Sequence, residues 1–325
     1  MTTTSSSEGP RCGCVLRTLG DDVQRILTTA MFLLTVAAFA QGAPPPPSAL
    51  HPRDIEQLTG AKGQLDTKEG VFKVSVPRTD LQVTAAGVKI PPAMGLTAWA
   101  AFQGAPQHTT VMGDIVLTEE QVNPVMSVAL DNGLEVTALH NHFFWESPRV
   151  MFMHIGGMGD EKALASAVGK VFAKVKETSS AAPAPPKVQI DPGKTSIDGA
   201  KIDSILGIKG SKVDGGVYKI TVGRTTRMDG MEAGNAMGVN TWAAFAGTDN
   251  IAVVDGDFAM LESELQPVLK ALRHSGIDIV AIHQHMTGEQ PRVLFLHYWG
   301  VGKAQDLAHG LRTALDQTEA KLGAR

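Results

Sequence analysis

Two segments of the chain carry histidines and a glutamate at one spacing, HxHx3Ex7H, although the residues between them have diverged. The members are His140, His142, Glu146 and His154 in the first segment, and His283, His285, Glu289 and His297, 143 residues later, in the second. Imidazole nitrogens together with a carboxylate are typical ligands of divalent transition metals. The pattern therefore predicts a metal site in each segment.

The histidines must be brought together by the strands that carry them. Residues i and i+2 of a strand project from the same face, so His140 and His142 point together. A chain reversal at residues 146–149 centres a hairpin near Pro148 and places His142 opposite His154. Three imidazoles then converge as in catalytic zinc sites, with a fourth position for water, substrate or Glu146. Zinc is the favoured ion, although iron, manganese, nickel, copper and cobalt accept the same ligands.

Two further pairs of residues in these segments suit catalytic roles. Glu146 and Glu289 act as metal ligands or as general bases, or they simply belong to the hairpin tip. Arg149 and Arg292 either hold an anionic substrate beside the metal or form a solvated corner. The competing interpretation of the whole pattern is that the histidines are core packing residues.

The repeat also contains aromatic and acidic residues outside the histidine segments. Trp99 and Trp242 are interpreted as core anchors rather than as substrate platforms. Asp114 and Asp257 each follow a glycine at a strand-like position. There they either orient a histidine from outside the ligand set or occupy a strand edge.

The similarity between the two halves covers a complete domain. MGLTAWAAF at 94–102 matches MGVNTWAAF at 237–245, at the same offset of 143 as the histidines. A Pro/Ala-rich linker, residues 178–196, separates the first repeat domain, 51–177, from the second, 197–325. Each domain is expected to fold alone.

The N-terminal region resembles a targeting segment. An uncharged run at 26–40 ends in Ala38-Phe-Ala40, which predicts a signal peptide over 1–40, followed by a Pro-rich spacer over 41–50. Cys12 and Cys14 precede the apolar run, so a cleaved chain carries no thiolate. These features predict a periplasmic or secreted protein without a stable membrane span after cleavage. An uncleaved anchor is the alternative.

Composition limits the partners. The chain has 325 residues, 43% of them hydrophobic, and a net charge of −4, with no cluster of lysine and arginine. Nucleic-acid binding requires a basic surface, so nucleic acid is excluded as a partner. A metal ion and a small anionic ligand remain as the expected partners.

Within each copy, apolar residues mostly alternate with a period of two. In the first copy this predicts strands at 71–78, 96–103, 110–117, 134–142 and 149–155. Helices are predicted at 118–131, which opens with a capping box at Thr118 and Gln121, and at 160–176. The order favours an α+β fold of two tandem homologous domains, each a largely antiparallel sheet with helices packed on one face.

The export segment, the tandem MG-x(3)-WAAF element and the final H-x-H-x(3)-E-x-P-R-V-x-F-x-H hairpin together resemble the LppY/LpqO family of secreted bacterial proteins. That resemblance implies export and one shared fold, and it supplies no reaction. The chain departs from the family's lipoproteins because no cysteine follows the apolar run. The histidine hairpin alone is distantly similar to the zinc hairpin of acetolactate decarboxylase.

Two classes of function remain open on these observations. In one, a metal-dependent enzyme of hydrolase or lyase type acts on a small anionic substrate. In the other, an exported protein binds metal without turnover, or serves as an envelope interaction module.

Overall fold

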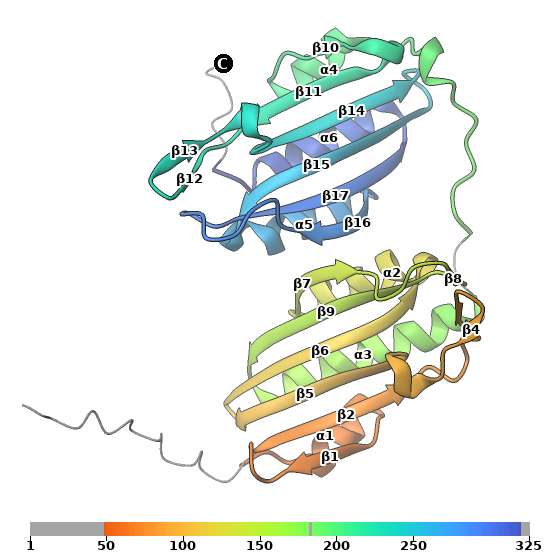
Figure 1. Ribbon diagram of the computed structural model, residues 1–325, viewed down its shortest axis with the longest axis vertical. Helices are drawn as coiled ribbons and strands as arrows, with labels where there is room; N and C mark the ends of the chain where they lie inside the picture. Colours follow the sequence, from red (N-terminus) through yellow and green to blue (C-terminus); the bar gives the residue numbers. More distant parts are fainter. Residues whose placement is uncertain (1–48, 182–183, 320–325) are drawn as a thin grey trace, which may run out of the picture. The chain divides into compact units, whose positions relative to one another are not determined.

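The computed structural model describes residues 49–181 and 184–319 (Figure 1). The predicted signal peptide, 1–40, and nearly all of the spacer lie outside these ranges, so export stays a prediction. Across the two described ranges, no helix is long and apolar enough to cross a membrane.

The first repeat is built from antiparallel strands and the helices that connect them. Its main elements are α1 (Pro52–Thr59), β1 (Gly63–Asp66), β2 (Val71–Pro77), β5 (Thr97–Ala105), β6 (His108–Thr118), α2 (Glu119–Asp131), β7 (Glu135–His140), β9 (Val150–Gly159) and α3 (Glu161–Ser180). A small second sheet contains β3 (Thr84–Ala85), β4 (Val88–Lys89) and β8 (Glu146–Ser147), and η1 (Pro92–Met94) follows β4.

The second repeat has the same plan. Its main elements are α4 (Gly199–Leu206), β10 (Ser211–Lys212), β11 (Tyr218–Gly223), β14 (Asn240–Gly247), β15 (Ala252–Leu261), η5 (Glu262–Glu264), α5 (Leu265–His274), β16 (Asp278–His283), β17 (Val293–Gly302) and α6 (Ala304–Leu315). A hairpin of β12 (Thr226–Met228) and β13 (Met231–Ala233) precedes η4 (Asn235–Met237), and η2 (Pro192–Lys194) and η3 (Asp214–Gly216) flank α4 and β10.

Helices cover one face of the sheet in each repeat, and the other face is open (Figure 1). On α3, one face packs against the strands through Leu164, Val168, Val171, Phe172 and Val175, all of them buried. The predicted α+β fold with helices on one face of an antiparallel sheet is thus confirmed. The capping box of Thr118 and Gln121 is also confirmed, and it starts α2 at Glu119.

The main strands form one twelve-stranded sheet within the described residues, because β7 of the first repeat pairs with β16 of the second. Two equivalent side chains flank this junction. Asn123 exchanges hydrogen bonds with the backbone of Ile279, and Gln266 does so with the backbone of Val136.

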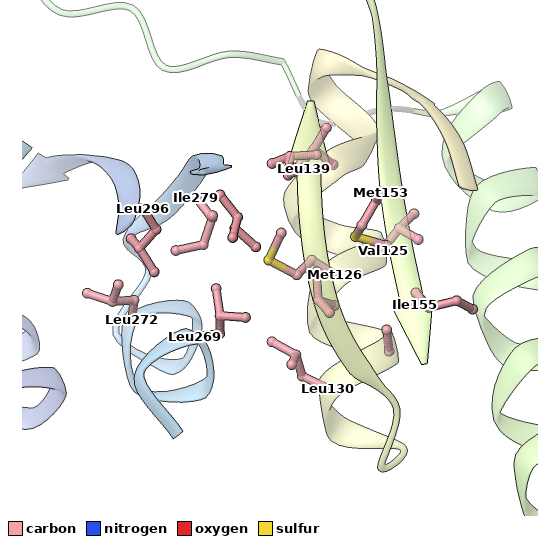
Figure 2. Close-up of a cluster of buried hydrophobic side chains, with 14 of the residues drawn as sticks. Val125, Met126, Leu130, Leu139, Met153, Ile155, Leu269, Leu272, Ile279 and Leu296 are labelled. Carbon is pink, nitrogen blue, oxygen red and sulfur yellow. The ribbon is translucent and has the colours of Figure 1, made fainter. Parts of the chain in front are cut away.

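Behind the junction lies a cluster of buried side chains from both repeats, among them Met126, Leu139, Leu269 and Leu272 (Figure 2). The repeats therefore share a sheet and a core, which the Pro/Ala-rich linker did not suggest. A repeat separated from the other would expose its part of this cluster to solvent.

Candidate metal centre

Strand register places the predicted site on the open face of the sheet. In the second repeat, Trp242, Asp257 and His297 lie opposite one another on β14, β15 and β17. The first repeat has the same row, made by Trp99, Asp114 and His154. Side chains at paired positions of neighbouring strands project from the same face. An aspartate therefore stands beside the third histidine in each repeat.

The predicted hairpin register was wrong. His142 does not lie opposite His154. Instead, Ala138 lies opposite His154 and His140 opposite Phe152, with a bulge between Val136 and Ala138. The reversal is wider than expected because β8, in the middle of the turn, pairs with β3 from outside the hairpin.

The displaced histidine stays beside the others by packing on an aromatic ring. The His142 imidazole stacks on Phe152, with ring centroids 3.3 Å apart, and the His285 imidazole stacks on Phe295 at 3.5 Å. Each second histidine thus leaves the strand ladder but remains on the open face.

The tightest group of candidate ligands within the described residues is Asp257, His283 and His285. One ligand atom from each residue lies within 4.8 Å of the other two. The Asp257 Oδ2 atom is 3.2 Å from His285 Nε2 and 4.0 Å from His283 Nε2. Ligand atoms of a tetrahedral zinc ion stand about 3.4 Å apart, given metal–ligand bonds of about 2.1 Å. A metal ion therefore fits between these atoms with small side-chain movements.

Backbone carbonyls set the orientation of two imidazoles. His285 Nδ1 lies 3.3 Å from the carbonyl oxygen of Gly238, and His297 Nδ1 lies 3.2 Å from that of Gly256. A proton on Nδ1 that is donated to a carbonyl leaves Nε2 with its lone pair, as in many metal-bound histidines. The His297 ring also stacks on the His283 ring, with centroids 4.9 Å apart.

Burial prepares the group for a cation. Desolvation, together with the neighbouring His297 and His285, lowers the pKa of His283 to about 4, so this imidazole is neutral at neutral pH. Desolvation raises the pKa of Asp257, against the opposing effect of His297 and His285. Asp257 Oδ1 and His283 Nδ1 are buried without a hydrogen-bond partner. Buried polar atoms without partners are costly, and an ion bound by both oxygens of the Asp257 carboxylate would give Oδ1 a partner.

The first repeat carries the same residue types, but among the described residues only Asp257, His283 and His285 of the second repeat bring three ligand atoms within 4.8 Å of one another. The ring centroid of His140 is 5.1 Å from those of both His142 and His154. Asp114 Oδ1 is buried without a hydrogen-bond partner, as in the second repeat. Desolvation lowers the pKa of His142, with Asp114 opposing the shift and His140 and His154 supporting it.

The glutamates and arginines lie at the hairpin turn. Glu289 is buried, and its Oε1 accepts a hydrogen bond of 3.1 Å from the backbone N–H of Val293 at the start of β17. The Glu146 side chain is 4% exposed and lies 3.9 Å from Arg149, which also contacts Glu119. Arg292 is exposed. The catalytic roles of Glu146, Glu289, Arg149 and Arg292 stay predictions.

Replacing Glu289 separates a structural role from a ligand role. Glu289→Ala leaves the buried N–H of Val293 without its acceptor, and the expected loss is about 1–3 kcal/mol in the free energy of unfolding, measured with urea. Glu289→Gln retains the acceptor and should keep both stability and zinc affinity. The exposed Glu232→Ala is the control. A tenfold weaker zinc affinity in Glu289→Gln would instead make this carboxylate a ligand.

Two sequence interpretations change with the geometry. Trp99 and Trp242 are not core anchors, because they lie half-buried on the open face under the ammonium groups of Lys73 and Lys219, at 4.0 and 4.6 Å. Asp257 belongs to the candidate ligand group rather than supporting it from outside. The available signal for this role was the repeated Gly-Asp pair.

Close packing excludes a side chain at position 256, which explains the glycine of that pair. A Cβ on Gly256 would lie 2.1 Å from Tyr298 Oη and 2.3 Å from the carbonyl oxygen of Trp242. The buried Tyr298 hydroxyl donates a hydrogen bond of 2.9 Å to that same carbonyl. The absence of a side chain at Gly256 therefore leaves room for Tyr298 on the helix-covered face of the sheet. The next residue, Asp257, faces the open side.

Comparisons with known proteins place the chain in a family. The model of the family described as Domain of Unknown Function (DUF1259) matches residues 53–174 and 200–317, one segment in each repeat. A comparison with curated proteins found no match. Among solved structures, a trimeric bacterial microcompartment shell protein, PduB, aligns with 78% of this chain and 90% of its own, at 11% identity and a TM-score of 0.18, a likeness that carries no argument. The protein therefore belongs to the DUF1259 family and carries the family's domain twice in tandem.

Proposed function

We propose that the protein binds one divalent transition metal ion in each repeat, with zinc as the favoured ion. The observation that carries the proposal is the group of Asp257, His283 and His285, whose ligand atoms lie within 4.8 Å of one another, with Asp257 Oδ2 3.2 Å from His285 Nε2 and 4.0 Å from His283 Nε2. His297, whose Nδ1 lies against the Gly256 carbonyl oxygen, is outside this group of three and is the candidate fourth ligand through Nε2. In the first repeat the corresponding ligands are Asp114, His140, His142 and His154.

The exposure of the site supports access by a small molecule. The side chains of His283 and His285 are 30% and 33% exposed, whereas that of Asp257 is 4% exposed. A metal ion bound by the buried Asp257 and the two partly exposed histidines would therefore be accessible to solvent. A metal with an accessible position can polarise a carbonyl or activate water, so the site suits a hydrolase or lyase acting on a small anionic substrate. Metal binding without turnover is the alternative.

Calorimetric titration of the metal-free protein with Zn²⁺ tests the proposal. The protein is the full chain with Cys12 and Cys14 replaced by serine, because thiolates would bind zinc outside the repeats. We expect about two equivalents of zinc per chain, one for each ligand set. Combined replacement of Asp257, His283 and His285 by alanine should leave about one equivalent.

A matched control removes an imidazole elsewhere. His309 is exposed on α6, away from both ligand sets, so His309→Ala should leave the zinc stoichiometry unchanged. Unchanged stoichiometry and affinity in the triple variant of the second repeat would show that the recurring histidines are packing residues.

We also propose that the protein is exported to the periplasm or secreted. The support is the uncharged run at 26–40 and its Ala38-Phe-Ala40 ending. The resemblance to the LppY/LpqO family agrees with this localisation, and the similarity to the zinc hairpin of acetolactate decarboxylase agrees with zinc. Mass spectrometry of the protein from the periplasm should find a start near Gln41; a membrane-retained product starting at Met1 would contradict export.

A further inference from the structure

Two large aromatic side chains project into solvent beside the first metal site. Phe144 and Trp145 are 74% and 83% exposed, and they lie between the candidate ligand His142 and Glu146. Trp145 has a φ of +57°, in the left-handed region that side chains other than glycine rarely adopt. The fold therefore holds a bulky apolar residue in an unfavourable conformation where it gains no burial.

The second repeat shows that the hairpin does not need these residues. The corresponding positions, 143 residues later, are Thr287 and Gly288, and Gly288 adopts a φ of +83° without the cost of a side chain. Both hairpins make the same turn on the same framework. The aromatic pair is thus specific to the first repeat, and the turn itself does not require it.

Other exposed apolar residues lie on a neighbouring segment that contacts this turn. Val88 and Met94 are 59% and 54% exposed on the adjacent segment. That segment reaches the metal site, because a Cβ on Gly95 would lie 3.6 Å from His142 Nδ1. It also contacts the aromatic pair, since the Ala86 N–H donates to the carbonyl oxygen of Trp145 at 3.4 Å. We call Val88, Met94, Phe144 and Trp145 the apolar rim.

We propose that the first site binds a small ligand with a flat, aromatic body, whose anionic oxygen atoms coordinate the metal while its ring packs on Phe144 and Trp145. The proposal rests on the metal-binding function proposed above. Aromatic rings stack on or pack edge-on against other rings, which is how an exposed aromatic pair gains contact area. A metal with an accessible position takes oxygen donors from an anion.

The charges beside the rim favour such a ligand over a membrane surface. Arg149 lies 3.6 Å from a carboxylate oxygen of Glu119 and 3.9 Å from one of Glu146, so two acidic groups accompany its charge. Proteins that bind anionic lipid surfaces present clusters of basic residues. Within the described residues, Lys89 is the only lysine or arginine next in sequence to a residue of the apolar rim. The second site lacks both aromatic residues, so it should bind metal without the preference for a ring.

The test compares two probes with the same chelating group. Acetohydroxamate and benzohydroxamate both bind zinc through two oxygen atoms, and only the second carries an aromatic ring. The protein is the full chain with Cys12 and Cys14 replaced by serine, with His283→Ala and His285→Ala to silence the second site. After loading with zinc, we expect it to bind benzohydroxamate roughly tenfold more tightly than acetohydroxamate, the upper range for an aromatic contact.

The matched variant gives the first repeat the turn residues of the second. Phe144→Thr with Trp145→Gly should retain zinc affinity and lose the preference for benzohydroxamate, and it should fold because Thr287 and Gly288 form the same turn. Benzohydroxamate should change the tryptophan fluorescence of the protein that retains Phe144 and Trp145. The change should be much smaller in the variant with Phe144→Thr and Trp145→Gly.

The possible failures are distinguishable. If the first site binds no zinc, the proposed function fails there and the inference fails with it. If zinc binds but both hydroxamates bind equally, or the preference survives the exchange, metal binding stands and the inference is overturned. Binding to vesicles of phosphatidylcholine and phosphatidylglycerol that the exchange abolishes, without any hydroxamate preference, would assign the rim to a membrane and likewise overturn it.

Discussion

Glu264→Ala is expected to lower the free energy of unfolding by about 3–5 kcal/mol, because it leaves the Arg224 guanidinium buried without its counter-ion. The two side chains are 7% and 8% exposed, and Arg224 donates from both terminal nitrogens to the carboxylate. Glu264 also accepts hydrogen bonds from the backbone N–H groups of Leu261 and Glu319. One carboxylate on η5 thus connects the residue after β11, the end of β15 and the segment after α6.

Urea unfolding of the full chain measures this loss. The neighbouring Glu262 is exposed on the same turn, so Glu262→Ala is the matched control and should change stability by less than about 0.5 kcal/mol. Replacing both partners, Arg224→Met with Glu264→Leu, should recover much of the loss, because no buried charge remains. Equal stability of the Glu262 and Glu264 variants would show that the pair contributes little.

The same residue predicts sensitivity to acid. Burial raises the pKa of Glu264, but hydrogen bonds from Arg224 and from the Glu319 and Leu261 backbones outweigh it and hold the pKa below 4.5. A pKa that is lower in the folded state stabilises the fold above pH 4.5, and this stabilisation disappears as the pH falls through the folded pKa. Glu264→Gln should therefore narrow the stability difference between pH 7 and pH 3.

Gly256→Ala is expected to cost about 3 kcal/mol of stability, at the upper end of overpacking effects. The new Cβ would lie 2.1 Å from Tyr298 Oη and 2.3 Å from the Trp242 carbonyl oxygen, and neither is the end of a flexible side chain. The backbone of β15 must move, and Asp257 moves with it. Zinc affinity of the second site should consequently fall by at least tenfold, a typical loss when the groups that position a ligand are disturbed.

Gly156 provides the control for this substitution. It lies on a sheet strand of the first repeat, and the nearest atom to a Cβ there would be 3.8 Å away, an ordinary contact. Gly156→Ala should leave stability nearly unchanged in thermal unfolding and leave zinc stoichiometry intact. If Gly256→Ala is equally silent, the close packing of Tyr298 behind Asp257 does not position this ligand.

Local patterns in the sequence were sufficient to predict most of the main strands and helices of the first repeat. Residues 71–78 were predicted as a strand and form β2, Val71–Pro77, because alternation with a period of two is a property of neighbouring residues. The capping box likewise located the start of α2. Short elements such as α1 and β3 escaped prediction, since α1 spans little more than two helical turns and β3 only two residues, too few to show their period.

The sequence by itself thus determined the duplication, the fold class and the presence of paired histidines in each repeat. Tertiary structure alone decided which atoms meet. The histidine hairpin aligned Ala138 rather than His142 with His154, and the pairing of β15 with β17 brought Asp257 to His297 from 40 residues away in the chain. Register depends on how distant strands align and on where an extra residue interrupts a ladder, and neither leaves a period in the sequence. The joining of β7 to β16 is of the same kind, because it depends on two edges that complement each other only after both repeats have folded.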